Sequence, residues 1–106
     1  MNVQPGRVVI FVAFLVLAAD AAFAAGQSEK GKAIAERWCA ACHQVSAEQT
    51  TASADVPSFM TIAQRATPSA LAVLEGFLAD SHPLMPDMSL TRQEIGDLVA
   101  YIGSLK

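Results

Sequence analysis

The most regular hydrophobic pattern of the chain lies at its C-terminal end. Apolar side chains recur there every three or four residues, at Ile95, Leu98, Val99, Ile102 and Leu105. This spacing places them on one face of an α-helix. Thr91 and Glu94 have the spacing of a capping box, in which each side chain accepts a hydrogen bond from the backbone N–H of the other residue. The pattern predicts a helix that begins after Thr91 and extends to Lys106.

A second helix is predicted from residue 28 to about residue 42. Its apolar positions at helical spacing are Ile34, Ala35 and Trp38. Ser28 is a residue type that caps the start of a helix. The segment 44–56 that follows is rich in Ser, Thr, Ala and Gln and has no sustained period, which indicates a loop.

Two shorter helices complete the pattern. One follows Ser58, a candidate cap, and has apolar positions at Phe59, Ile62 and Ala63. The other starts at Thr67, a second candidate cap, with proline at its first helical position, and it ends near Asp80. Its apolar stripe consists of Leu71, Leu74, Phe77 and Leu78. No convincing strand pattern and no internal repeat is present, so we expect an all-α fold of three to five helices in one domain, residues 25–106.

The N-terminal segment has the organisation of a signal peptide. Arg7 precedes a continuous apolar run over residues 8–18, and Ala22-Phe23-Ala24 supplies small residues at its first and third positions, as a signal peptidase requires for cleavage after Ala24. We therefore expect residues 1–24 to be removed and the protein to be exported to the periplasm. The alternative is an uncleaved membrane anchor, but Asp20 interrupts the apolar segment, which falls short of the ~20 residues that span a bilayer.

Composition and charge limit the possible partners. The chain has 106 residues, 53% of them hydrophobic, and a net charge of −3. Nucleic-acid binding calls for a concentrated basic surface, so we expect no nucleic-acid partner. The domain left after removal of residues 1–24 is small enough that its own hydrophobic core would be marginal, and a largely apolar cofactor would complete that core.

The candidate chemistry is concentrated in Cys39-Ala40-Ala41-Cys42-His43. Two cysteines three residues apart, followed directly by histidine, form the pattern of covalent haem attachment, in which the thiols add to the haem vinyl groups and the imidazole binds iron. In a helical turn the two cysteines lie on one face, and the two alanines leave room for the ring. The motif predicts one covalent haem c held by Cys39 and Cys42, with His43 as an iron ligand.

Three other interpretations use the same residues. A thioredoxin-like pair requires a βαβ context that the pattern does not predict. A zinc site would combine Cys39, Cys42 and His43 with His82, but adjacent Cys42 and His43 would strain to bind one metal ion. A structural disulfide, which is common in exported proteins, leaves the histidine unexplained.

The second candidate element is the segment 82–88. Its two prolines flank Met85 and hold the backbone extended, which lets a side chain reach the iron from the side opposite His43. A methionine thioether is a soft ligand that suits haem iron, and histidine with methionine raises the reduction potential relative to two histidines. Met85 is the expected sixth ligand. Met88, His82 and an open site are the alternatives.

The haem motif, the Met85-Pro86 step about forty residues later, Leu90-Thr91 and the helix of residues 95–102 together resemble a small bacterial class I cytochrome c. The resemblance covers the chain after the N-terminal segment. In that family the first and last helices cross where a small residue meets an aromatic one, and Gly31 and Tyr101 stand at the corresponding positions.

The family also places a proline carbonyl against the outer nitrogen of the haem histidine. Pro57 is the position that resembles it, and an ordinary turn proline is the alternative. Such a bond would fix the tautomer of His43 and leave its other nitrogen free for iron.

The resemblance implies an electron carrier and not an enzyme. Its donor would be a reductase or dehydrogenase, and its acceptor an oxidase or reductase. The alternatives are a haem-bearing subunit of a larger oxidoreductase complex and an exported thiol-disulfide oxidoreductase. Ala40, Ala41 and Leu84 are candidates for an apolar rim around the exposed haem edge, where a redox partner would dock.

Overall fold

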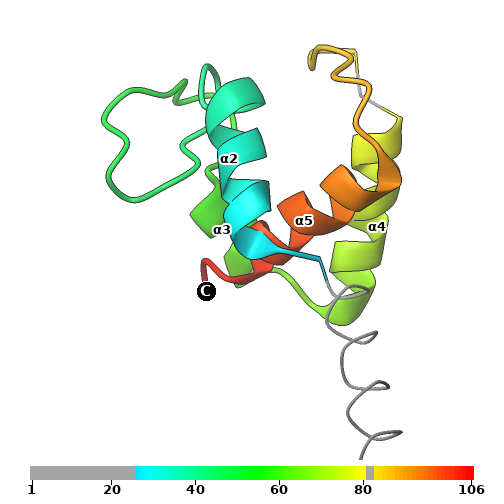
Figure 1. Cartoon of the computed structure of the whole chain (residues 1–106). Helices are drawn as coiled ribbons and strands as arrows, with labels where there is room; N and C mark the ends of the chain where they lie inside the picture. The colour runs from blue at the N-terminus through cyan, green and yellow to red at the C-terminus, as the bar shows by residue number, and fades with distance from the viewer. Residues whose placement is uncertain (1–25, 81–82) are drawn as a thin grey trace, which may run out of the picture.

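Four helices account for the regular structure of the residues that the structure describes, 26–80 and 83–106. They are α2 (Ser28–Trp38), α3 (Phe59–Gln64), α4 (Pro68–Ala79) and α5 (Arg92–Gly103) (Figure 1). This computed structural model contains no strand within those two ranges, and the all-α prediction is confirmed. The predicted signal peptide and His82 lie outside the described residues. None of the described helices has the length and apolarity needed to cross a membrane.

The crossing of α2 and α5 is the closest helix contact. A Cβ atom added at Gly31 would meet the backbone carbonyl of Asp97 and would lie 2.8 Å from the Cβ of Tyr101. Glycine inside a helix costs about 1 kcal/mol relative to alanine. Here the missing side chain allows the two backbones to approach, and the predicted crossing of Gly31 with Tyr101 is confirmed.

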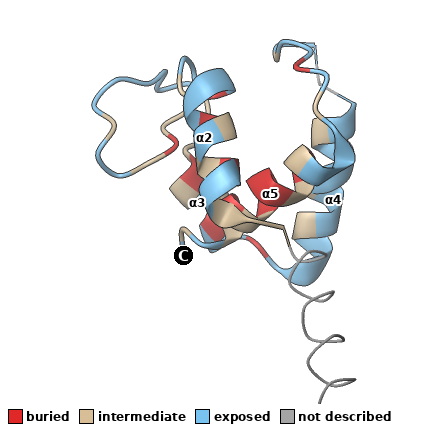
Figure 2. Cartoon of the chain, viewed as in Figure 1, coloured by how far each residue is buried: buried red, intermediate tan, exposed pale blue. Residues whose placement is uncertain are grey.

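The core is built around α5. Figure 2 shows the buried residues concentrated on α5 and on the parts of α2 and α3 that face it. The buried cluster consists of Ala35, Cys39, Val45, Phe59, Ala63, Leu98, Tyr101 and Ile102. No residue of α4 is buried, although α4 packs against α5 and the side chains of Leu74 and Leu78 reach the cluster. One side of α4 is therefore left open toward α3.

Three of the four predicted helix caps are present. The Ser58 and Thr67 hydroxyls accept hydrogen bonds from the N–H groups of Thr61 and Ala70. At the start of α5, the Thr91 N–H donates to Glu94 Oε2 (2.7 Å), and the Glu94 N–H donates to Thr91 Oγ1 (3.2 Å). The Glu94 carboxylate accepts hydrogen bonds from the backbone N–H of Thr91 and, at 2.9 Å, from its hydroxyl, and these two bonds, the first most of all, lower the pKa of the Glu94 carboxyl from its ordinary value.

The cap predicted at Ser28 is wrong. Gln27 is the N-cap of α2, and its side chain makes no capping hydrogen bond. Its backbone N–H instead donates to Asp97 Oδ1 at 2.7 Å, so a buried carboxylate on α5 takes the place of a local cap. The distance along the chain between the two partners explains why the local sequence does not indicate this contact.

Two predicted helix ends are also wrong. The first helix stops at Trp38, and its last carbonyls are satisfied from the turn that follows: the N–H of Cys39 makes an ordinary helical bond to the Ala35 carbonyl, and the N–H of Ala40 donates to the same carbonyl from one residue farther along. The last helix ends at Gly103 and not at Lys106. Trp38, one of the apolar positions of the first helix, is 42% exposed.

Candidate haem site

The two cysteines lie in a tight turn directly after α2. The N–H groups of Cys42 and His43 donate to the carbonyl of Cys39 at 3.2 and 2.8 Å, which closes the turn. Cys39 is buried, Cys42 is exposed, and both are free thiols. Burial raises the pKa of the Cys39 thiol to about 11 in the chain without haem. The turn therefore places two cysteine side chains, not joined by a disulfide, next to a histidine.

The ring of His43 is held by a backbone carbonyl. Its Nδ1 lies 2.7 Å from the carbonyl oxygen of Pro57. A carbonyl oxygen only accepts hydrogen bonds, so Nδ1 carries the proton and donates it. The lone pair is then on Nε2, the nitrogen that faces away from Pro57, and a neutral imidazole in this tautomer is a metal ligand. The Phe59 ring packs against the imidazole with a centroid separation of 5.6 Å.

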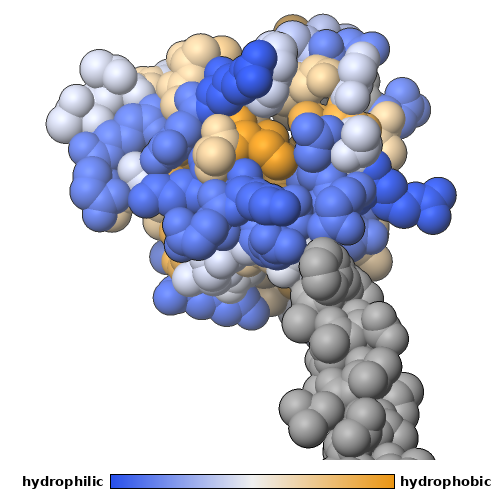
Figure 3. All heavy atoms as spheres, in the orientation of Figure 1, coloured by the Kyte–Doolittle hydropathy of each residue, from blue (hydrophilic) through white to orange (hydrophobic). Residues whose placement is uncertain are grey.

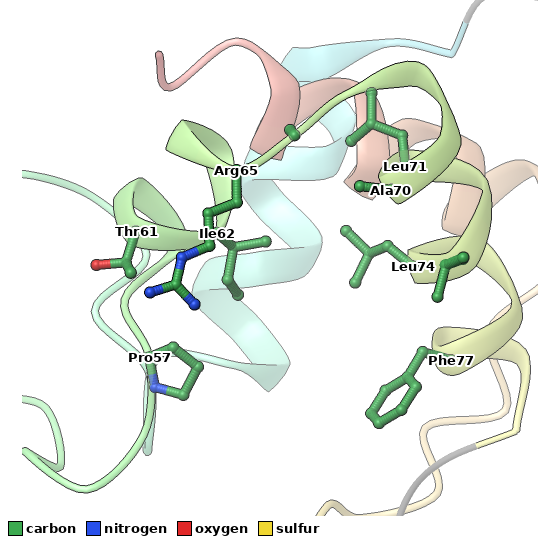
Figure 4. Close-up of a pocket in the computed structure, with 10 residues that line it drawn as sticks. Pro57, Thr61, Ile62, Arg65, Ala70, Leu71, Leu74 and Phe77 are labelled. Atoms are coloured by element: carbon green, nitrogen blue, oxygen red, sulfur yellow. The ribbon is translucent and has the colours of Figure 1, made fainter.

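A cavity of about 290 Å³ opens between α3 and α4, and Pro57, whose carbonyl binds His43, lines it. Pro57 lies at one end of the cavity, and Ile62 faces Leu74 and Phe77 across it (Figure 4). Figure 3 shows apolar side chains in a hollow of the surface between α2 and α4, framed by hydrophilic residues. Apolar walls of this kind suit a flat, largely apolar macrocycle. The residues present therefore fit a haem attached at the adjacent turn.

Met85 lies on a separate loop. It is half-buried, Met88 three residues later is buried, and Leu84 is 93% exposed. The carboxylate of Asp87 accepts a hydrogen bond from the Ser89 N–H at 2.9 Å, and Ser89 has a φ of 49°. This loop and the Cys39–His43 turn lie at the same end of the molecule (Figure 1).

The structure thus brings Cys39, Cys42, His43 and Pro57 together and leaves Met85 on a neighbouring loop. Within residues 26–80 and 83–106 no group of three or more His, Cys, Asp or Glu side chains is placed to hold a metal ion, and His82, the fourth ligand of the zinc interpretation, lies outside these ranges.

Two contacts at the site are absent from the sequence prediction. The Tyr101 hydroxyl donates to the carbonyl of Val45 at 2.6 Å, and the Gln49 side chain bonds several backbone groups of the haem motif and the loop. Tyr101 and Val45 are far apart in the chain, and Gln49 lies in a loop without hydrophobic period. Neither the spacing of hydrophobic residues nor a short sequence motif predicts such contacts.

A helical fold that carries two free thiols and a carbonyl-bound histidine at the end of its first helix, beside an apolar cavity, has the organisation of a c-type cytochrome. The family model for cytochrome c matches residues 28–106. Cytochrome c-552 of Bradyrhizobium diazoefficiens is 44% identical over 97 residues, which cover 92% of each chain. No solved structure matches. The chain belongs to the cytochrome c family, and its cofactor is covalently bound haem c. Its role is electron transfer.

Proposed function

We propose that the protein is an exported monohaem carrier that accepts one electron from a reductase or dehydrogenase and passes it to an oxidase or reductase. Cys39 and Cys42 hold the haem, and His43 and Met85 are the two iron ligands. The observation that supports this best is the hydrogen bond from His43 Nδ1 to the Pro57 carbonyl, made next to two free thiols and an apolar cavity.

Haem c supplies an iron that gains and loses a single electron. The two cysteines tether the ring at the end of α2 and so fix its position relative to the cavity. Pro57 orients the His43 imidazole and makes it a more basic ligand, because a hydrogen bond to the outer nitrogen increases electron density on the inner one. The apolar side chains of α3 and α4 exclude water, which keeps the change in solvation on electron transfer small.

Met85 would supply the second protein ligand of the iron from its neighbouring loop. A soft thioether opposite histidine raises the reduction potential. If His43 and Met85 both held the iron, no position would be left for a substrate, which argues for a carrier and against an enzyme. Met88 and His82 remain the competing ligands.

Export and processing follow from the N-terminal segment. Removal of residues 1–24 would release the protein into the periplasm without a membrane anchor. Haem attachment and contact with redox partners would then take place in that compartment. The competing role, a subunit of a larger oxidoreductase complex, predicts stable association with other chains, whereas a free carrier migrates as a monomer.

The test is an optical redox titration of the purified exported protein. We expect a reversible change of the haem spectrum that follows the Nernst relation for one electron, with no thiol available for alkylation in denaturant. Two alkylatable thiols and a two-electron transition would identify a thiol-disulfide oxidoreductase instead. Size-exclusion chromatography of the same sample separates the carrier from the subunit of a complex.

A further inference from the structure

One side chain in the loop after the haem motif contacts four backbone groups. The Nε2 of Gln49 lies 2.9 Å from the carbonyl oxygens of both Ala40 and His43, and it also contacts the carbonyl of Thr51. Its Oε1 accepts a hydrogen bond from the N–H of Val45 at 2.9 Å. A glutamine amide has two donor hydrogens and an acceptor oxygen, so the three carbonyls share two hydrogens while Oε1 accepts from the N–H.

The backbone groups that Gln49 binds belong to the haem motif itself. Ala40 stands between the two cysteines, and its carbonyl lies beyond the end of α2, where no helical hydrogen bond is available to it. His43 carries the imidazole. Hydrogen bonds to both carbonyls fix the backbone on either side of Cys42, and therefore the direction in which the His43 side chain leaves the turn.

The same side chain connects the motif to the core. Val45 is only 1% exposed, and its carbonyl accepts a hydrogen bond from the Tyr101 hydroxyl on α5. Gln49 binds the N–H of this residue. The carbonyl of Val45 is thus bonded to α5 and its N–H to Gln49, which connects the turn to the helix around which the core is built.

We propose that Gln49 is a positioning residue for His43. It holds the turn so that the imidazole meets the Pro57 carbonyl with Nδ1 and the iron with Nε2. The proposal rests on the proposed ligation by His43.

The experiment follows the exchange of the His43 Nδ1 proton with solvent in the reduced holoprotein, by NMR of the histidine side chain, together with the reduction potential. Gln49→Met keeps the length and removes all four contacts. We expect the proton to exchange roughly thirtyfold faster, the effect of losing about two hydrogen bonds of ordinary net strength. The potential should rise, because a weaker bond to Pro57 makes the imidazole a poorer donor to iron.

Gln44→Met is the matched control. Gln44 lies in the same loop, and its side chain makes a single long hydrogen bond, 3.4 Å, to the Gln49 carbonyl. It should leave both readouts near the wild-type values. Gln49→Asn keeps the amide on a chain one methylene shorter, so its exchange rate should fall between those of the wild type and the methionine variant, and it replaces that variant if Gln49→Met gives no holoprotein.

A merely structural role predicts a different result. The Gln49 variants would then lose thermal stability, but their Nδ1 proton exchange rate and reduction potential would differ from wild type no more than those of Gln44→Met. That result would overturn the proposal. Failure of the ligation itself is recognised separately, because the wild-type spectrum would then lack a His43 signal shifted by the haem.

Discussion

At the scale of single residues, the side chains that would bind haem lie in one short segment, whereas the residues that hold this segment in place come from distant parts of the chain. Cys39, Cys42 and His43 are adjacent in sequence, and the motif alone predicts their use. Pro57 was identified only through the family resemblance, and the structure places its carbonyl against His43. Gln49 and Asp97 were not predicted, because a polar side chain that bonds a distant backbone group leaves no periodic signal.

The sixth ligand is tested by a pair of methionine variants. Met85→Ala should lower the reduction potential and open the iron to added ligands such as azide or imidazole, because the thioether is lost. Met88 is buried, so Met88→Ala should cost about 2–5 kcal/mol of stability while coordination stays intact. The reduction potential, the titration with added ligand and the thermal unfolding of both variants show which methionine binds iron and which only packs in the core. The opposite pattern would make Met88 the ligand.

At the scale of elements, hydrophobic period and short capping motifs predicted the number and order of the helices. The ends were less predictable where long-range contacts decide them. The cap of α5 is contained in four consecutive residues and was predicted, whereas the start of α2 depends on Asp97, some seventy residues away in sequence. Similarly, the cavity between α3 and α4 depends on how the two helices are placed relative to each other, so the hydrophobic pattern of either helix alone does not predict it.

The close crossing of α2 and α5 is tested by alanine at Gly31. The added Cβ would overlap the Asp97 carbonyl and the Cβ of Tyr101, so we expect a net loss of about 1–3 kcal/mol despite the better helix propensity of alanine. Gly96→Ala on α5 is the control, since a Cβ there meets nothing within 4 Å. It should stabilise the protein by up to about 1 kcal/mol. Denaturant unfolding of the two holoproteins gives both values, and equal effects would show that the helices do not meet at Gly31.

The capping box makes a prediction about pH. The pKa of Glu94 is lowered from its ordinary value of 4.5 in the folded protein, so its contribution to stability is fully present above that value and is lost as the pH falls below it. Glu94→Gln keeps an oxygen that accepts from the Thr91 N–H but does not titrate. The difference in melting temperature between wild type and variant should therefore shrink as the pH is lowered from about 6 to about 3. A difference that is constant over this range would mean that the carboxylate gains nothing from the cap.

At the scale of the whole molecule, charge and surface determine how a partner approaches. Six basic and nine acidic side chains lie in residues 25–106, and the haem propionates add negative charge. Of the residues expected at an apolar rim, Ala41 and Leu84 are exposed and Ala40 is half-buried. The partner surface is thus expected to depend on short-range apolar contact more than on long-range attraction.

This charge balance predicts the response of electron transfer to salt. The rate constant with an acidic redox partner should be low at low ionic strength and should not decline as salt is added, because screening removes repulsion. With a basic partner the rate should fall as salt is added. Stopped-flow kinetics with one partner of each kind measures both trends. A steep decline with the acidic partner would reveal a concentrated basic patch.

The central claim, an exported domain with one haem bound through Cys39 and Cys42, is tested most directly by the intact mass and visible absorption of the purified protein in denaturant. The account predicts a single species with the mass of residues 25–106 plus one haem, which keeps its visible absorption when unfolded. A Cys39→Ala, Cys42→Ala double variant should lack the added mass and should be largely unfolded, because a domain this small has little core of its own. Haem that separates from the wild-type chain in denaturant, or a double variant that keeps native helicity without haem, would contradict the account.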